Sequence, residues 1–513
     1  MTREVRVRFA PSPTGALHIG GVRTALYNYL FARKMGGKML LRIEDTDQTR
    51  FVPGAENYIL EALKWIGITI DEGMSVGGPD APYRQSERKP MYMEYALKLV
   101  TEGNAYYAFD TPEELEAMKE RMKAAKVASP SYNSITRTQM KNSLTLPEDE
   151  VKKKLAAGEP YVIRLKVPRK DEIRINDLVR GWVMVHSSAI DDKVLMKSDG
   201  MPTYHLANVV DDHLMNISHV IRGEEWLPSA PLHVLLYKFL GWEDTMPQFA
   251  HLPLLLKPDG NGKLSKRDAD AGGFPIFPLD WKDPKTNETA MGFREQGYLP
   301  EAMVNFLAFL GWNPGTQQEI FSMDELVQAF SIERIGKSGT KFDINKAKWF
   351  NQQYIRQKTS DELADYLLAE LTSRNMVCDR PKAIRISELM KERLVFAKDL
   401  WNEGKFFFVF PESYDESVIS SKWNGDAVKI ITEFKDSLNS LSSVTAEEAK
   451  NTLNVVLEKN GVKMGKVLQA LRVAITGLGM GPDLMFIIEI LGKDETVKRI
   501  EAALKTLNNK VVA

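Results

Sequence analysis

The feature that most constrains the fold is a strand, a turn and a helix at the start of the chain. Residues 5–9 (VRVRF) alternate as a strand does, and apolar residues then recur at helical spacing from Val22 to about Met35. Residues 38–44 (KMLLRIE) predict the next strand. Strand, helix and strand at this spacing form a βαβ unit, which implies a parallel sheet with a right-handed crossover.

The turn inside this unit has the composition of a phosphate site. Residues 8–21 read RFAPSPTGALHIGG, which places His18 at the N-terminus of the helix. Gly15, Gly20 and Gly21 let the backbone come close to a bulky anionic ligand. Free N–H groups and the helix dipole at this end favour phosphate. His18 and Glu44 both follow strands at the carboxyl edge of the sheet, where ligands of such sheets bind.

A second short segment, KLSKR at residues 263–267, would supply mobile positive charge to the same phosphates. Either segment alone is weak, because a glycine-rich turn is more often packing and a Lys-x-x-Lys pattern is more often a solvated loop. Their order, their wide separation and the PSPTG run before His18 together favour function.

The totals set broad limits. A length of 513 residues indicates three to four domains. The formal net charge of −1 neither requires nor excludes nucleic acid, so a basic face would have to be local. Cys378 is the only cysteine, which excludes an intrachain disulfide and a cysteine-rich zinc site. The first residues carry no apolar signal region and no stretch approaches a membrane span, so we expect a cytoplasmic protein without membrane contact.

The two segments resemble the HIGH-like and KMSKS-like motifs of class I aminoacyl-tRNA synthetases, and the chain resembles bacterial-type glutamyl-tRNA synthetases along nearly its whole length. Further matches are RIEDTD at 42–47, PTYHLA at 202–207, RGEEW at 222–226, FD at 342–343, WFNQQYI at 349–355 and LRVAITG at 471–477. The resemblance implies a glutamate–tRNA ligase, which forms glutamyl-adenylate and pyrophosphate from glutamate and ATP. It then transfers glutamate to the 3′-terminal adenosine of tRNA-Glu.

The resemblance also implies an α/β Rossmann-type catalytic domain with an inserted α+β acceptor-binding domain, followed by an all-α anticodon-binding half. We place the catalytic domain at 1–82 and 213–270, the insertion at 83–212 and a stem-contact region at 271–341. The helical half would cover 342–513, with two subdomains that divide near residue 400. We expect a monomer.

Three departures from the family pattern stand out. Gly21 replaces the last histidine of the first motif, so one phosphate contact of other class I enzymes is missing. Where some relatives carry a zinc cluster this chain reads YYAF at 106–109, so we expect no zinc. The segment 272–289, rich in Pro, Gly, Asp and Asn, is longer than the typical family connection and has no assigned role.

Amino-acid activation needs positioned reactants and charge stabilisation, but no general base, because a carboxylate is already a nucleophile at neutral pH. Magnesium would arrive with ATP, held mainly by phosphates and water. By resemblance His18 and Lys266 are the catalytic candidates. The full ATP-binding set is Pro11, Thr14, Gly15, His18, Gly20, Gly21, Lys263, Leu264, Ser265, Lys266 and Arg267.

Glutamate carries two carboxylates and one ammonium, which calls for cationic forks and one anion. By resemblance the glutamate-binding residues are Arg8, Ala10, Ser12, Glu44, Tyr204, Asn208 and Arg222. Which arginine faces which carboxylate stays open. An alternative pairs Arg8 or Arg42 with Glu44 or Asp45 as internal salt bridges. We favour a structural role of this kind for Arg42, Asp45 and Asp47, but not for Arg8, Glu44 and Arg222. Asp211, Asp212 and His213 have the residue types of a metal cluster, but adjacent residues rarely converge on one ion, so we expect them to lie in a solvated turn.

Three rival functions remain possible at this level. A tRNA-independent nucleotidyltransferase and a glutamyl-queuosine-type paralogue would not need a helical half, and the length of the chain argues against both. A binding protein without catalysis is disfavoured because every expected site position carries a usable residue. The sequence does not settle whether tRNA-Gln is also charged, or which residues of the helical half would contact tRNA.

Overall fold

The computed structural model describes residues 3–127 and 129–507. The chain forms two compact units, residues 1–350 and residues 351–513. The boundary between them falls within helix α11 (Ile344–Gln357). Within the described ranges, no helix is both long and apolar enough to cross a membrane.

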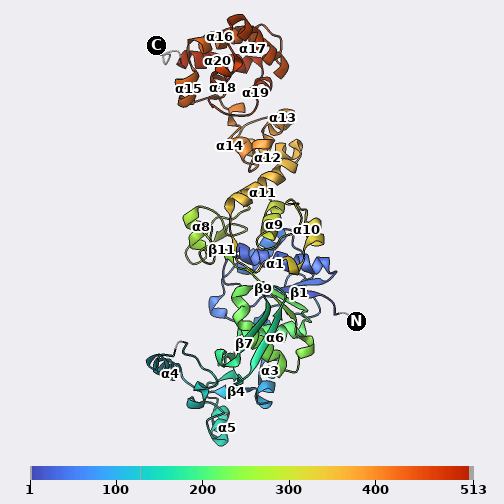
Figure 1. The fold of residues 1–513 in the computed structure, drawn as a ribbon, viewed down its shortest axis with the longest axis vertical. Coiled ribbons are helices and arrows are strands. Elements are labelled where there is room, and N and C mark those ends of the chain that lie inside the picture. Colours follow the sequence, from blue (N-terminus) through green and yellow to red (C-terminus); the bar gives the residue numbers. More distant parts are fainter. Residues whose placement is uncertain (1–2, 128, 508–513) are drawn as a thin grey trace. The chain divides into compact units, whose positions relative to one another are not determined.

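A seven-stranded sheet forms the centre of the first unit (Figure 1). Its order is β3-β2-β1-β9-β10-β6-β7, with parallel pairing except for the final antiparallel hairpin of β6 and β7. The strands are β1 (Arg6–Phe9), β2 (Lys38–Leu41), β3 (Glu72–Gly73), β6 (Glu172–Asp177), β7 (Gly181–His186), β9 (His219–Gly223) and β10 (Gln248–Leu252).

The predicted βαβ unit is present. Strand β1 pairs in parallel with β2, Arg6 opposite Lys38 and Phe9 opposite Leu41, and α1 (Ile19–Lys34) connects them. All four residues of β1 are buried, as expected for a strand with neighbours on both sides and helices above and below. The chain adds β2 and β3 on one side of β1 and β9 and β10 on the other, so the strand order reverses between β1 and β9.

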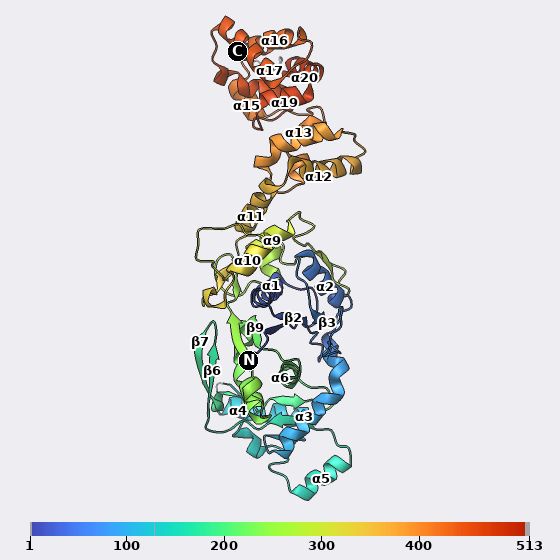
Figure 2. The ribbon, with the colours of Figure 1, turned by 90° about the vertical axis from the view of Figure 1, so that its right-hand side faces the viewer.

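Helices cover both faces of this sheet (Figures 1 and 2). Helix α1 packs against β1, β2 and β9, and α9 and α10 pack on α1. Helix α6 lies on the opposite side of the sheet from α1 and packs on α3 and α7. The bounds of these and the neighbouring helix are α2 (Ala55–Trp65), α3 (Lys89–Thr101), α6 (Tyr204–Leu214), α7 (Ala230–Phe239), α9 (Pro300–Ala308) and α10 (Met323–Ala329).

A second, antiparallel sheet lies between α3 and α6 in the sequence. Its order is β4-β5-β8, and the chain that builds it also forms two peripheral helices. These elements are β4 (Ala105–Ala108), β5 (Val162–Leu165), β8 (Val194–Met196), α4 (Pro112–Ala124) and α5 (Glu148–Ala156). The β6–β7 hairpin lies within the same stretch of sequence but joins the central sheet through β10.

The segment after the KLSKR motif is only partly irregular. It forms α8 (Lys266–Gly272) and a two-stranded antiparallel pair, β12 (Trp281–Lys282) with β13 (Thr289–Ala290). The Tyr58 hydroxyl of α2 donates to the carbonyl oxygen of Leu279 at 2.6 Å, and the Trp281 ring packs edge-on against Tyr58. The segment is therefore packed onto α2. Two further strands of this unit, β11 (Leu255–Leu256) and β14 (Thr340–Lys341), pair in parallel.

Every regular element in the described part of the second unit, residues 351–507, is helical. This agrees with the expected all-α half. Helices α12 and α13 pack together, and α16 packs against α17 and α20. The helices are α12 (Ser360–Ser373), α13 (Arg380–Met390), α14 (Asp399–Asn402), α15 (Glu416–Lys422), α16 (Gly425–Asn439), α17 (Ala446–Asn460), α18 (Leu468–Thr476), α19 (Leu484–Leu491) and α20 (Lys493–Leu507).

Candidate active site

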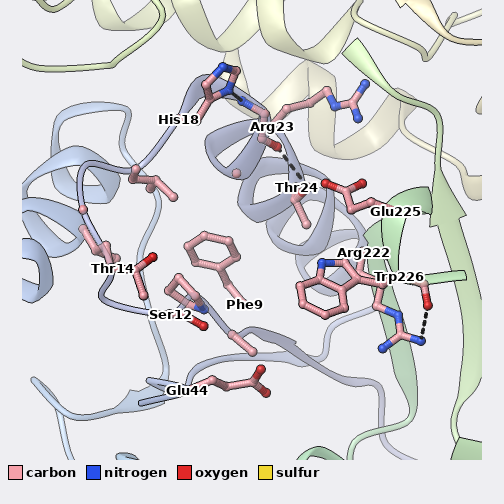
Figure 3. A pocket seen from close by; sticks show the side chains of 18 of the residues that line it. Phe9, Ser12, Thr14, His18, Arg23, Thr24, Glu44, Arg222, Glu225 and Trp226 are labelled. Carbon is pink, nitrogen blue, oxygen red and sulfur yellow. Dashed lines mark hydrogen bonds between the residues drawn. The ribbon is translucent and has the colours of Figure 1, made fainter. Parts of the chain in front are cut away.

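A cavity of about 520 Å³ opens at the carboxyl ends of β1 and β9, where the strand order reverses (Figure 3). Such a reversal leaves a crevice because the connections from the two neighbouring strands leave on opposite sides of the sheet. Phe9 ends β1, Arg222 and Gly223 end β9, and Glu44 follows β2, so all three strands contribute to the wall.

Most residues predicted for the site line this one cavity. All seven residues expected to hold glutamate are present, together with eight of the eleven expected to hold ATP, which are Pro11, Thr14, Gly15, His18, Gly20, Gly21, Lys263 and Leu264. Ser265, Lys266 and Arg267 are not among the lining residues.

Three positions in the turn formed by residues 8–21 require glycine for different structural reasons. Gly15 has a φ of +146°, a conformation that residues with a Cβ rarely adopt. A Cβ on Gly21 would lie 2.6 Å from the Cδ1 atom of Leu17, so this glycine lets the turn pack against the helix. A Cβ on Gly20 would lie 3.3 Å from the Nδ1 atom of His18. Gly20 therefore makes room for the histidine.

His18 is held in one tautomer with one nitrogen left over. Its Nδ1 atom accepts a hydrogen bond from the backbone N–H of Gly20 at 2.9 Å, so the proton of the neutral ring lies on Nε2. Nε2 is buried and has no hydrogen-bond partner in the described structure. Burial, with a further contribution from the charge of Lys263, lowers the pKa of His18 to about 4. At neutral pH the cavity therefore contains an uncharged N–H donor.

The start of α1 differs from the sequence-based expectation of free N–H groups. The N–H of Ile19 donates to the carbonyl oxygen of Ile276 at 2.9 Å, and those of Gly21 and Val22 donate to the His18 carbonyl. The 272–289 segment thus supplies a cap for the helix, and its Phe277 ring packs edge-on to His18 at 6.3 Å. Because these N–H groups are occupied, the helix offers its dipole and the His18 donor rather than a row of free amides.

The KLSKR motif reaches the cavity only at its first two residues. The Nζ atom of Lys263 lies 2.8 Å from a carboxylate oxygen of Glu225, and both side chains are exposed. Ser265 caps α8, of which Lys266 is the first residue, in a capping box with Asp268. The motif therefore ends in a helix start, which fixes Lys266 outside the lining of the cavity in this conformation.

Six charged side chains form a buried cluster beneath the cavity. Asp212 accepts hydrogen bonds from Arg8 Nε at 3.0 Å and from Arg42 Nη1 at 2.8 Å. The expectation that Asp211 and Asp212 lie in a solvated turn is wrong, because both are buried on α6. The cluster consists of the arginines Arg8, Arg42 and Arg88 and the carboxylates Glu44, Asp211 and Asp212. Three positive and three negative charges leave it neutral.

Glu44 is oriented by this cluster. Its Oε1 atom accepts hydrogen bonds from Arg42 Nη2 and from Asn208 Nδ2, both at 2.9 Å. Both of the side-chain hydrogen bonds that the described structure gives Glu44 use Oε1, which leaves Oε2 to meet a ligand cation. The salt-bridge alternative therefore holds for Arg42 with Glu44, while Arg8 pairs with Asp212. Asp45 instead accepts hydrogen bonds from Ser86.

Arg222 is a buried cation bonded only to uncharged groups in the described structure. Its Nε atom donates to Nε2 of His251 at 3.0 Å, Nη1 to the Tyr204 hydroxyl at 2.7 Å and Nη2 to the Trp226 carbonyl at 3.3 Å. Its side chain is 5% exposed, and burial lowers its pKa from the ordinary value. The part of the cavity around Arg222 thus contains a buried positive charge without a charged partner in the described structure.

Several lining residues were not predicted from the sequence. Trp226 packs on Tyr204 with ring centroids 4.6 Å apart, and the RGEEW segment already contained it. Arg23 of α1 is buried and donates to the carbonyls of Leu310 and Pro253. No local pattern indicated Arg23, because both of its partners lie more than 200 positions away. Across residues 3–127 and 129–507, no group of three or more His, Cys, Asp or Glu side chains is placed to hold a metal ion.

Comparison with known families gives two consecutive matches. The model described as tRNA synthetases class I (E and Q), catalytic domain, matches residues 4–349. The model described as an anticodon binding domain matches residues 358–504.

Individual proteins match over the full length. The glutamate–tRNA ligase of Cytophaga hutchinsonii is 72% identical, with 99% of both chains covered, and that of Amoebophilus asiaticus is 61% identical, also with 99% of both covered. Among solved structures, a glutamate tRNA ligase from Elizabethkingia meningosepticum in complex with its amino acid has a TM-score of 0.95. It is 50% identical, and the match covers 98% of this chain and all of that one.

Proposed function

The chain belongs to the class I tRNA synthetases of the glutamate and glutamine group, and we propose a role in glutamate charging for each side chain of its candidate site. The activity is that of a glutamate–tRNA ligase, which charges tRNA-Glu with glutamate at the expense of ATP. The roles of individual residues, the order of the steps and the domain limits form the proposal.

Charge balance supports the proposal that glutamate binds in the part of the cavity around Arg222, which we call the amino-acid end. The buried cluster of Arg8, Arg42, Arg88, Glu44, Asp211 and Asp212 is neutral, whereas the neighbouring Arg222 is bonded only to uncharged groups in the described structure. Glutamate carries a net charge of −1 and glutamine none. Glutamate would therefore neutralise Arg222, whereas glutamine would leave a buried guanidinium without a counter-charge, which costs far more than a lost neutral contact.

The other polar groups fit the remaining parts of glutamate. Glu44 would accept a hydrogen bond from the substrate ammonium through Oε2, and Asn208 would hold the Glu44 carboxylate in place. We assign the side-chain carboxylate of glutamate to Arg222 with Tyr204. Arg8 would contact the α-carboxylate, because its charge is already balanced by Asp212 and so does not need a second full anion. Ala10 and Ser12 would complete the wall.

The other end of the cavity would take ATP. The α-carboxylate of glutamate would attack the α-phosphate, with pyrophosphate leaving, so no proton has to be removed. His18 would donate its Nε2–H to a phosphate oxygen, and Lys263 would neutralise the phosphates after leaving Glu225. Lys266 would do the same if the start of α8 shifts toward the cavity. Magnesium would be held chiefly by phosphates and water.

The remaining parts of the chain fit a tRNA substrate. We propose that the β4-β5-β8 sheet with α4 and α5, within 83–212, contacts the acceptor end, that 271–341 contacts the stem and that the helices of 342–513 bind the anticodon. Transfer to the 3′-terminal adenosine follows adenylate formation. We propose a cytoplasmic monomer. The match of residues 358–504 to an anticodon binding domain supports the helical assignment.

The test of this proposal is amino-acid selection at Arg222. Arg222→Ala and Arg222→Cys should lower kcat/KM for glutamate by about 10²–10⁴ while changing residual glutamine activity little. The measurement is the ratio of kcat/KM for the two amino acids on tRNA-Glu. Arg174→Ala is the matched control, because Arg174 lies in the same sheet with its side chain exposed. An unchanged ratio in the Arg222 variants would transfer selection to Arg8 and Tyr204.

A further inference from the structure

We propose that Asp177 and His251 are positioning residues for amino-acid selection, which set the orientation of the Arg222 guanidinium through a chain of two buried hydrogen bonds. This inference rests on the proposed role of Arg222. Neither residue lines the cavity, so both would act through Arg222 rather than on the substrate.

The three side chains lie on adjacent strands of the central sheet. Arg222 on β9 stands opposite His251 on β10 in parallel register, and β10 pairs on its other side with β6, which ends at Asp177. The carboxyl ends of parallel strands meet at one edge of a sheet. The topology therefore brings Asp177 and Arg222 to the same edge although they lie 45 positions apart in the sequence.

The hydrogen bonds allow only one tautomer of His251. Arg222 Nε carries a proton and donates to His251 Nε2 at 3.0 Å, so Nε2 must be the acceptor. The ring proton then lies on Nδ1, which donates to Asp177 Oδ2 at 2.6 Å. Burial is the largest influence on His251 and lowers its pKa, so the ring stays neutral beside the guanidinium. A protonated ring would turn a donor toward Arg222.

Asp177 is itself fixed from the backbone. Its Oδ1 atom accepts the N–H groups of Val179 at 3.0 Å and Arg180 at 2.8 Å. Burial opposes its ionisation, but these bonds and the one from His251 outweigh burial and hold the pKa of Asp177 below its ordinary value. Asp177 and His251 are both buried, so water does not compete for these bonds. Asp177 is thus a rigid anionic acceptor that orients the ring.

The consequence appears at the other end of Arg222. A guanidinium has five N–H donors, and the bonds to His251, Tyr204 and Trp226 use three of them. One N–H remains on each of the two terminal nitrogens. This pair can meet a carboxylate with two parallel hydrogen bonds, and its direction depends on the anchored Nε. Without that anchor the fork can rotate, and a neutral amide would no longer be rejected as strongly.

The first experiment separates hydrogen bonding from packing at position 251. His251→Leu removes the acceptor, whereas His251→Gln keeps an oxygen that can accept from Arg222. In tRNA-Glu charging by the full-length enzyme, His251→Leu should raise KM for glutamate by about 10- to 100-fold and reduce the glutamate-to-glutamine ratio. His251→Gln should restore most of both. KM for ATP should be unchanged in both variants, because ATP is proposed to occupy the other end of the cavity.

The second experiment acts on the tautomer. In Asp177→Asn the amide oxygen would keep the Val179 and Arg180 contacts, which places the amide NH₂ against His251 Nδ1. The ring would then carry its proton on Nε2, facing the Arg222 donor. We expect KM for glutamate to rise in Asp177→Asn as much as in His251→Leu. The midpoint of thermal unfolding should stay near that of His251→Gln.

Three outcomes would overturn the inference. Wild-type KM values for glutamate in His251→Leu and Asp177→Asn, alongside lost selection in Arg222→Ala, would leave the role of Arg222 intact but remove the two positioning residues. Equal increases in KM for glutamate and ATP would reveal a general structural defect. Unchanged selection in Arg222→Ala would remove the proposed role of Arg222 and this inference with it.

Discussion

The neutral cluster beneath the cavity predicts a large stability cost for Asp212→Asn. The substitution keeps the size of the side chain but removes the negative charge that Arg8 and Arg42 share. The cluster would then hold three positive and two negative charges. Arg42 is fully buried and Arg8 is 3% exposed, so neither can recover its hydration in the folded protein.

The size of the effect follows from this burial. Breaking a buried ion pair by removing one partner costs about 3–5 kcal/mol, because the remaining charge stays desolvated. An unfolding entropy of about 2 cal/mol/K per residue over a unit of 350 residues corresponds to about 0.7 kcal/mol per degree. The thermal midpoint of the catalytic unit should therefore fall by about 4–7 °C.

The pH dependence of stability gives a second test of the ion pairs that Asp212 forms with Arg8 and Arg42. Burial raises the pKa of Asp212, but Arg8 and Arg42 outweigh it and bring the pKa below the ordinary value of 3.8. A carboxyl group with a lowered pKa in the folded state stabilises the protein above its unfolded pKa. That contribution is lost as pH falls through the folded value. The difference between wild type and Asp212→Asn should thus be constant at neutral pH and shrink below about pH 4.

Differential scanning calorimetry of the full chain with and without Asp212→Asn measures this shift. Glu116→Gln is the matched control in the same unit, because it breaks an exposed ion pair with Lys119 and should leave the midpoint unchanged. An Asp212→Asn midpoint equal to that of the control would refute the claim that the cluster is dehydrated and charge-balanced.

Two further predictions concern the end of the cavity that we propose binds ATP. Lys266 is expected to act only as charge builds on the phosphates. Lys266→Ala should therefore lower turnover by about 10²–10³ while changing KM for ATP less. Near-normal turnover of this variant in steady-state charging would exclude the KLSKR segment from the mechanism. Because burial lowers the pKa of His18 to about 4, the ring resonances of ¹³C-labelled His18, assigned with His18→Gln, should not shift between pH 8 and about 5.5; a midpoint near 6.5 would contradict the neutral donor.

Local patterns were sufficient for the βαβ unit, whereas most of the cavity wall was predicted from the family resemblance. The alternation at residues 5–9 and the helical spacing after Val22 depend on neighbours in sequence, and β1 and α1 formed where these patterns placed them. Glu44 reaches the cavity because it follows a parallel strand, and Arg8 and Arg222 reach it because each is the next-to-last residue of one. The rule about strand ends predicted that His18 and Glu44 converge, and the resemblance added Arg8 and Arg222.

Local patterns gave wrong predictions for residues whose partners lie far away in the sequence. Asp211 and Asp212 read as an exposed turn because their partners Arg8, Arg42 and Arg88 lie more than 120 positions away. The cap on α1 was hidden for the same reason, since the carbonyl of Ile276 comes from the 272–289 segment. Lys266 was placed at the phosphates by its motif, whereas the Ser265–Asp268 capping box makes it the start of a helix outside the cavity lining.

These contacts give the two ends of the cavity different electrostatic designs. At the proposed amino-acid end the charges of Arg8 and Glu44 are balanced within the buried cluster and Arg222 has no charged partner in the described structure, so binding there would depend on the charge of one substrate group. At the proposed ATP end His18 is uncharged and Lys263 is paired with exposed Glu225, so Lys263 would reach the phosphates only after that ion pair opens. Such a pair costs little to break. On this proposal, amino-acid selection rests on fixed buried groups, while charge stabilisation of the phosphates would depend on groups at the surface that can rearrange.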